Sequence, residues 1–289
     1  MFSTFGRSWE MLKQSYAVLK KQKTLLVLPV LSGLACLVVL ASFALPFIVN
    51  PELAEKFFAD AKQAKQQGDS SLQIVGFVFA FLFYFVNYFI IVFFNTALAS
   101  CAIVHFKGGE PTLGDGLAAA SRRLPQILAW AFVAATVGMI LKAIEDKAGR
   151  LGTFIVGLLG LAWSAAVYLV VPVLAVEGLG PVAAVKRSIG LLRKTWGEGL
   201  AGGLGLGLAG FLLSLPGIVL IVVGGMLGAT SVPLMVAIIA LGFIYLVGIS
   251  IVLSTLKQIF ISGLYLYAAE GQLPSGFSED IVSEAFRKK

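Results

Sequence analysis

Long runs of apolar residues alternate with short polar segments along the whole chain. Six of these runs are predicted to be membrane-spanning helices, and they cover residues 25–49, 72–105, 125–141, 151–176, about 200–227 and 232–269. A spanning helix needs about 20 residues, with about 17 as the lower limit, so each run is long enough. The second and sixth runs would form helices of roughly 50 and 57 Å, against a hydrocarbon core of about 30 Å. We expect these two helices to tilt, to kink or to project beyond the membrane.

Two polar segments show helical patterns of their own. Within residues 1–24, Trp9, Leu12 and Tyr16 recur at helical spacing among basic residues, which predicts an amphipathic helix on the membrane surface. Residues 50–68 predict a short external helix whose apolar stripe faces lipid or the other spans. Asn50 suits its N-cap, and Pro51 suits its first position.

A short motif follows three of the apolar runs. In each copy a charged residue and a glycine are followed, after two further positions, by a proline. The copies are Lys107-Gly108-Gly109-Glu110-Pro111, Glu177-Gly178-Leu179-Gly180-Pro181 and Glu270-Gly271-Gln272-Leu273-Pro274. Glycine suits the left-handed residue that ends a helix, and proline suits the first position of the next one. The motif therefore predicts that a membrane helix ends and a surface helix begins, with Pro111, Pro181 and Pro274 at the three helix starts.

The three motifs divide a single six-span membrane domain, residues 1–289, into repeat units. The units cover about 1–107, 111–177 and 181–270, and 271–289 form a cytoplasmic tail. Each unit would contain a surface helix, a span, an external turn and a second span, so the units are predicted to be parallel helical-hairpin repeats. The surface helices of units one and three also align, Arg7 to Tyr16 with Arg187 to Trp196. The alternative is chance similarity among basic helices beside a membrane.

Composition agrees with an all-α integral membrane protein. Hydrophobic residues make up 58% of the chain and charged residues 13%, whereas soluble domains have about 25% charged residues. We expect no signal peptide, because the first 24 residues are polar and basic and the following run is too long. Cys36 and Cys101 lie inside apolar runs, so neither a disulfide nor a metal site is expected.

The net charge of +7 is explained by basic cytoplasmic segments better than by nucleic-acid binding. Most Lys and Arg residues lie on the same side as the termini if both termini are cytoplasmic. The positive-inside rule therefore predicts a multi-pass protein of the inner or plasma membrane with cytoplasmic amphipathic helices at that face. Nine basic residues of these helices are predicted to bind anionic phospholipid headgroups. They are Arg7, Lys13, Lys20, Lys21, Lys23, Lys186, Arg187, Arg193 and Lys194.

Three polar residues interrupt the long spans. Lys257 would either snorkel to the headgroups or line a polar cavity. Gln258 precedes Glu270 by as many residues as Asn95 precedes Lys107, so these two amides could pair between helices. Alternatively, each bonds its own helix or a neighbouring carbonyl. His105 lies at the membrane edge, where an interfacial anchor is favoured over metal or proton chemistry.

The fifth span is rich in glycine. Residues 205–210 match a dinucleotide-binding pattern, but they lie within an apolar span without the strand that this pattern requires. Gly199, Gly203 and Gly207 instead form a doubled GxxxG motif, which predicts close helix packing. The neighbour would be in the same chain rather than in a second protomer, although a homo-oligomer or a protein partner remains open.

Six spans with recurrent Glu-Gly-x-x-Pro junctions, followed by Ser and Arg, resemble an uncharacterised prokaryotic family of six-span membrane proteins. More distantly, they resemble the membrane domain attached to some glycerophosphoryl diester phosphodiesterases. The resemblance implies a six-span fold and no catalytic residues, because it concerns a non-catalytic part.

No catalytic or metal-ligand cluster occurs in the sequence, so an enzyme and a cofactor are not expected. The span centres lack carboxylates, which disfavours a cation-driven pump. Two functions are left: a lipid-associated scaffold or accessory protein, which is favoured, and a transporter or channel for an amphiphile or small solute.

Overall fold

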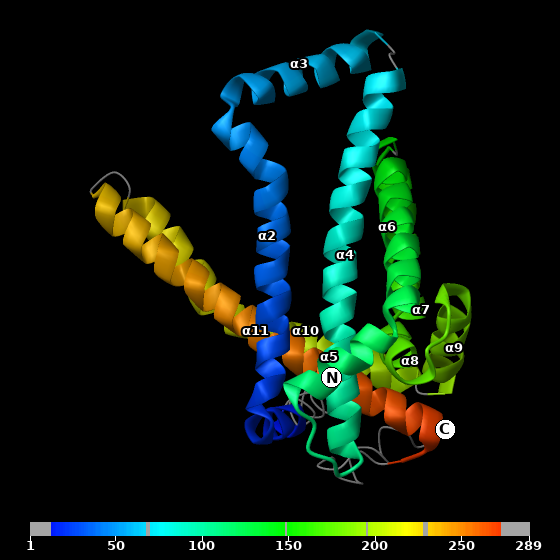
Figure 1. Cartoon of the computed structure of the whole chain (residues 1–289). Coiled ribbons are helices and arrows are strands. Elements are labelled where there is room, and N and C mark those ends of the chain that lie inside the picture. The colour runs from blue at the N-terminus through cyan, green and yellow to red at the C-terminus, as the bar shows by residue number, and fades with distance from the viewer. Residues whose placement is uncertain (1–12, 68–69, 148, 195, 228–230, 273–289) are drawn as a thin grey trace.

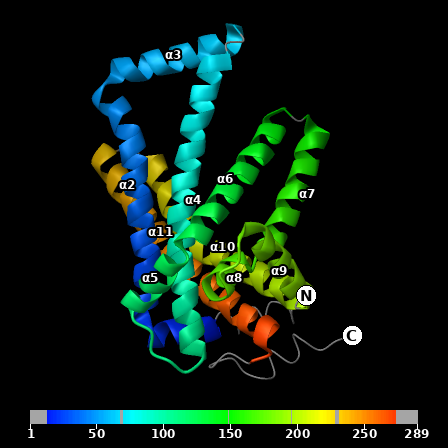
Figure 2. The same ribbon diagram turned by 45° about the vertical axis from the view of Figure 1, so that its right-hand side comes forward.

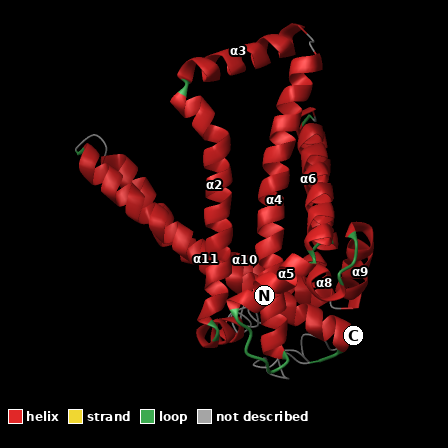
Figure 3. Cartoon of the chain, in the orientation of Figure 1, coloured by secondary structure: helices red, strands yellow, loops and turns green. Residues whose placement is uncertain are grey.

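The computed structural model describes residues 13–67, 70–147, 149–194, 196–227 and 231–272, and these are helical apart from short connections (Figure 3). The named helices are η1 (Lys23–Leu26), α2 (Val27–Val49), α3 (Pro51–Gln67), α4 (Ser70–Phe106), α5 (Leu113–Arg122), α6 (Leu124–Lys147), α7 (Arg150–Ala166), α8 (Val170–Glu177), α9 (Pro181–Lys194), α10 (Trp196–Met226) and α11 (Val232–Glu270). The all-α prediction is confirmed, and the described ranges contain no β-strand.

Six helical stretches within the described residues are long and apolar enough to cross a membrane. They are Lys23–Val49, Ile74–Phe106, Leu124–Lys147, Gly152–Glu177, Gly207–Met226 and Val232–Glu270. The number of spans is as predicted, but the third span is longer than the predicted 125–141. Residues 142–147 continue α6, because Lys142 lies 3.2 Å from Glu145 and 3.1 Å from Asp146 on successive turns of one helix.

The spanning helices form three pairs (Figures 1 and 2). The pair of α2 and α4 is connected by α3, α6 packs on α7, and α10 packs on α11. All three pairs extend from one packed end of the molecule, and α10 and α11 leave it at a slant. We call this end the base. It comprises residues 13–28, 92–134, 169–194 and 255–271.

The buried core lies in the base. Leu98, Ile127, Leu174 and Ile259 are among its fully buried side chains, and they come from four different helices. The outer parts of the helix pairs instead expose large apolar side chains: Val38 of α2 is 68% exposed. Apolar side chains at such exposure are expected where lipid, not water, surrounds a helix. The excess length of α4 and α11 is accounted for by roughly their last 15 residues, which lie in the base and are mostly buried.

Helix α3 forms as the sequence predicted. The backbone N–H of Leu53 donates to Asn50 Oδ1 at 3.2 Å, so Asn50 caps the helix that Pro51 begins. Phe57 of α3 contacts the rings of Phe47 in α2 and Phe79 in α4, with centroid distances of 5.3 and 6.2 Å. The apolar stripe of α3 thus packs on the neighbouring spans.

The fourth span is not one continuous helix. It is interrupted at residues 167–169, between α7 and α8. Pro172 explains the interruption, because proline lacks the N–H that would bond the carbonyl four residues earlier and its ring clashes with that carbonyl. The N–H of Leu169 is instead satisfied by Ser188 Oγ of α9 at 3.1 Å, and both residues are fully buried.

The three motif glycines all adopt the left-handed conformation. Gly108, Gly178 and Gly271 have φ of 87°, 62° and 68°, and no other described residue has a positive φ. The prolines behave less uniformly. Pro181 is the first residue of α9, as predicted, and Pro274 lies outside the described residues.

The prediction that Pro111 begins a surface helix is wrong, because α5 begins two residues later, at Leu113. Thr112 and Asp115 form a capping box there, in which the Asp115 N–H donates to Thr112 Oγ1 and the Thr112 N–H donates to Asp115. The hydrogen bonds from Thr112 lower the pKa of the Asp115 carboxyl. This reciprocal cap satisfies two backbone N–H groups and places the helix start directly after Thr112.

Close helix packing through glycine occurs at positions other than those predicted. Among the described residues, no atom of a neighbouring element lies within 4 Å of the place that a Cβ would take at Gly207, so no described helix packs closely there. The neighbourhoods of Gly199 and Gly203 lie outside what the structure describes. A Cβ on Gly242 of α11 would lie 2.9 Å from the backbone oxygen of Gly217 in α10, so these two glycines allow the close approach.

Candidate functional site

The three motifs meet at the base through ion pairs and hydrogen bonds. Lys107 Nζ lies 2.8 Å from Glu270 Oε1, which joins the first motif to the third. The Glu177 carboxylate accepts hydrogen bonds from Arg187 Nε at 2.9 and 3.0 Å and from the Tyr265 hydroxyl at 2.9 Å. The second motif is therefore joined to α9 and to α11, and the ends of three long helices are held together.

Arg123 adds a further contact to the second motif. Its Nη2 donates to the backbone oxygen of Val176 at 3.0 Å, where the C-terminal carbonyls of α8 lack helical partners. Its guanidinium also covers Gly178 so closely that a Cβ there would collide with it. A cation at a helix C-terminus is favourable, because the carbonyl ends carry partial negative charge.

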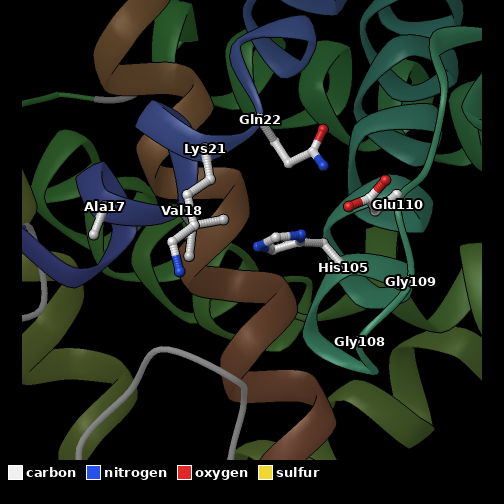
Figure 4. Close-up of a pocket in the computed structure, with 8 residues that line it drawn as sticks. All are labelled: Ala17, Val18, Lys21, Gln22, His105, Gly108, Gly109 and Glu110. Atoms are coloured by element: carbon white, nitrogen blue, oxygen red, sulfur yellow. The ribbon is translucent and has the colours of Figure 1, made fainter.

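A cavity of about 410 Å³ lies beside these contacts. It is lined by residues 17, 18, 21 and 22 on one side and by residues 105 and 108–110 on the other (Figure 4). The first set directly precedes the first span, and the second set directly follows α4. We call it the headgroup cavity, because it lies where two spans end on the same side of the molecule.

The side chains of the headgroup cavity are unusually polar for a membrane protein. Lys21, Gln22, His105 and Glu110 all line it, and His105 Nδ1 is buried without a hydrogen-bond partner among the described residues. Gln22 Oε1 accepts a long hydrogen bond of 3.4 Å from Thr24. One cation and one carboxylate thus face a space that a small polar ligand could fill.

The basic residues that were predicted to bind headgroups are found in the base wherever they are described. Lys13, Lys20, Lys21, Lys23, Lys186 and Arg193 are exposed. Arg187 differs, because its guanidinium is paired with Glu177 and its charge is compensated. Arg7 lies outside the described residues, and the side chain of Lys194 is not described.

The predicted intramembrane pair is not formed. Gln258 is buried, and its Nε2 has no hydrogen-bond partner among the described residues, so it does not donate to Asn95. The Gln258 carbonyl accepts from Ser262 Oγ at 2.8 Å within the same helix. Lys257 is exposed and does not line the headgroup cavity, which agrees better with a side chain that snorkels.

Comparison with protein families gives one match. The model described as "Family of unknown function (DUF6159)" matches residues 74–277, which include every helix from most of α4 to α11. The chain belongs to this family. Comparison with curated proteins gives no match. The more distant resemblance to the membrane domain of glycerophosphoryl diester phosphodiesterases is not shown.

Several features of this DUF6159 member were not foreseen from its sequence. Tyr265 and Arg123 were not singled out, because both lie in segments without any motif. A second cavity of about 420 Å³ between α4 and α6 was also missed; it is lined by Tyr84 and Tyr88 and by small residues such as Ala135 and Gly138. The small residues in α6 could have indicated this cavity in the sequence, because small side chains leave space beside aromatic ones.

Proposed function

We propose that the protein is a lipid-associated scaffold or accessory protein of the inner or plasma membrane, with its base at the cytoplasmic face. The distribution of exposed charge in the base supports this proposal. Helical residues 13–21 and α9 carry six exposed or partly exposed Lys and Arg residues without a carboxylate: Lys13, Lys20, Lys21, Lys186, Arg187 and Arg193. In α3, at the far end, lysines alternate with Glu52, Glu55 and Asp60.

The level of the membrane surface follows from the first span. Lys20, Lys21 and Lys23 are exposed, and a few residues later Val27 and Val30 are exposed apolar residues. A change from cations to exposed valines within one or two turns is typical of the boundary between headgroups and hydrocarbon. The cations would therefore lie at headgroup level, where each contributes about 1 kcal/mol to binding an anionic leaflet.

We also infer that the three helix pairs are parallel hairpin repeats. The left-handed glycines after α4, α8 and α11 support this inference, and so does the meeting of all three motifs at the base. On this interpretation each repeat unit has a second span, which is α4 in the first unit, α7 with α8 in the second, and α11 in the third. Equivalent helix ends would then place three similar surface segments at one face of the membrane.

The test measures lipid retention by native mass spectrometry of the purified protein. A variant with Lys20→Gln, Lys186→Gln and Arg193→Gln is compared with one carrying Lys56→Gln, Lys62→Gln and Lys147→Gln at the far end. Each variant loses three positive charges, and all six side chains are exposed, so the two variants are matched. We expect wild type to prefer phosphatidylglycerol over phosphatidylcholine, and the base variant to lose at least about tenfold of that preference.

The far-end variant should behave like wild type. Equal retention of both lipids by wild type, or equal loss in both variants, would show that the base cations only determine orientation in the membrane. The lipid-associated function would then be abandoned.

A transporter of an amphiphile is the second candidate, and the cavity between α4 and α6 favours it. It ranks second because Lys257, the residue expected to line a transport cavity, is not among the residues that line this one. Proteoliposomes that move a fluorescent phospholipid between leaflets no faster than protein-free vesicles would exclude lipid transport.

A further inference from the structure

The headgroup cavity has walls from two different spans at the same membrane surface. Lys21 and Gln22 lie just before the first span, which begins at Lys23, and His105 lies in the last turn of the second, which ends at Phe106. These three residues lie within two residues of a span end, and the rest of both walls follows within about two helical turns. A ligand in this cavity would lie at the depth of lipid headgroups and beside the hydrocarbon.

The cavity presents both signs of charge. Lys21 and Glu110 line it, and neither forms an ion pair with another described residue. In Figure 4 the Gln22 amide and the Glu110 carboxylate lie on one side of the His105 ring, and the Lys21 ammonium lies on the other side. His105 Nδ1 is buried and unpaired among the described residues, and a buried polar atom of this kind normally has a partner.

These groups restrict the chemistry of the ligand. A purely anionic phosphate would lie against the Glu110 carboxylate, and a metal cation would lie against the Lys21 ammonium. The described residues also contain no cluster of three His, Cys, Asp or Glu residues that could hold a metal. A ligand with a phosphate for Lys21 and His105 and an ammonium for Glu110 satisfies all three groups.

The wall formed by the first motif leaves room for such a ligand because it is made of glycine. Gly108 is left-handed, and a Cβ at Gly109 would lie 2.7 Å from Val104 Cγ1. Both positions therefore exclude a side chain, for backbone conformation in one case and for space in the other. The volume of about 410 Å³ is within the range of about 300 to 1,000 Å³ that is usual for ligand sites.

We infer that the headgroup cavity binds a phospholipid with a phosphoethanolamine headgroup, in which a phosphate diester lies beside a primary ammonium. The inference rests on the proposed function only in placing the base at a membrane surface. The primary ammonium is the deciding group, because it donates N–H hydrogen bonds to a carboxylate and a choline group cannot.

The first test changes the ligand and leaves the protein intact. Wild-type protein is presented with phosphatidylethanolamine, its N-methyl and N,N-dimethyl derivatives, and phosphatidylcholine, all with the same acyl chains. Native mass spectrometry should show one tightly retained lipid, with retention that falls about tenfold in total as N–H groups are removed. Equal retention across the series would overturn the inference.

The second test compares Glu110→Gln with Glu55→Gln, in which an exposed carboxylate on α3 is removed in the same way. Glu110→Gln should abolish the preference for phosphatidylethanolamine over phosphatidylcholine, and Glu55→Gln should keep it. An unchanged preference in Glu110→Gln would overturn the assignment of the ammonium to this carboxylate.

A third arm identifies the source of the headgroup. Soluble glycerophosphoethanolamine at 1 mM carries the same group without acyl chains, and it should displace less than about a tenth of the bound lipid, because burial of the acyl chains supplies most of the affinity of a membrane ligand. Full displacement would overturn a membrane source. The proposed function is measured by anionic preference and base cations, so either one can fail while the other holds.

Discussion

Single glycines determine how the base is assembled. Gly178 has a left-handed backbone, with a φ of 62°. The guanidinium of Arg123 also occupies the place that a Cβ on Gly178 would take. Any side chain there would be strained by the backbone and would also push Arg123 away from the Val176 carbonyl. Gly180, two residues later in the same motif, has no atom within 4 Å of its Cβ position and no left-handed φ.

We expect Gly178→Ala to destabilise the protein and Gly180→Ala to leave it unchanged or slightly more stable. The left-handed conformation alone costs an alanine about 1 to 2 kcal/mol, whereas alanine at an unstrained position reduces the entropy of the unfolded chain. Thermal unfolding in detergent, followed by circular dichroism, measures the difference. Equal melting temperatures for the two variants would show that the left-handed glycine is not required.

At the scale of elements, the interruption of the fourth span is the most specific feature. The N–H of Leu169 would be unsatisfied at the start of α8, and Ser188 from the following surface helix accepts it. One hydroxyl therefore couples the position of α9 to the break between α7 and α8. Both residues are fully buried, so water does not replace the bond.

Ser188→Ala should reduce the free energy of unfolding by about 1 to 3 kcal/mol, because it leaves a buried N–H without an acceptor. Ser254→Ala is the matched control, since the Ser254 hydroxyl is exposed and bonds only to Ile251 of its own helix. Denaturant-induced unfolding in detergent micelles compares the two. A Ser188→Ala variant as stable as Ser254→Ala would mean that the Leu169 N–H finds another partner.

The elements were more predictable than their contacts. Long apolar runs predict spanning helices whatever lies around them, so six spans and the capped helix α3 could be found from the sequence. The break at 167–169 was hidden because Val167, Tyr168 and Leu169 continue the apolar run, and Pro172 was its only signal. The bond from Tyr265 to Glu177 joins residues 88 apart, and no local pattern encodes such a contact.

Gly207, one of the three glycines predicted to pack, is open in this chain for a related reason. A span with many glycines contains several GxxxG frames, and the frame that packs is decided by the rotation of the helix against its neighbour. In α10 that rotation brings Gly217 to Gly242 and leaves Gly207 open. The headgroup cavity was likewise beyond the sequence, because its two walls come from segments more than eighty residues apart.

At the scale of the whole molecule, all three helix pairs leave the same base (Figure 1). In the base, helical residues 13–21 and α9 carry exposed cations and no carboxylate, whereas α3 and the outer end of α6 carry both signs. If all pairs span one membrane, the base and the far ends lie on opposite sides of it. By the positive-inside rule, we propose that the base is on the cytoplasmic side.

Single cysteines test this arrangement in a Cys36→Ala, Cys101→Ala background. An impermeant maleimide added to whole cells should label Glu55→Cys and Lys147→Cys, and it should label Ser121→Cys and Lys186→Cys only after permeabilisation. All four positions are exposed, so differences in labelling report the side of the membrane. Labelling of Lys186→Cys in intact cells would reverse or break the proposed orientation.

The three long arms of the molecule differ in how they transmit force. Helices α4 and α11 run without a break into the base, where Lys107 and Glu270 join their ends. Because each of these helices is continuous, a tilt of its outer part would also displace its inner end and the Lys107–Glu270 ion pair there. The middle arm is interrupted at residues 167–169, so no continuous helix passes a tilt of α7 on to α8 and its contact with Arg187.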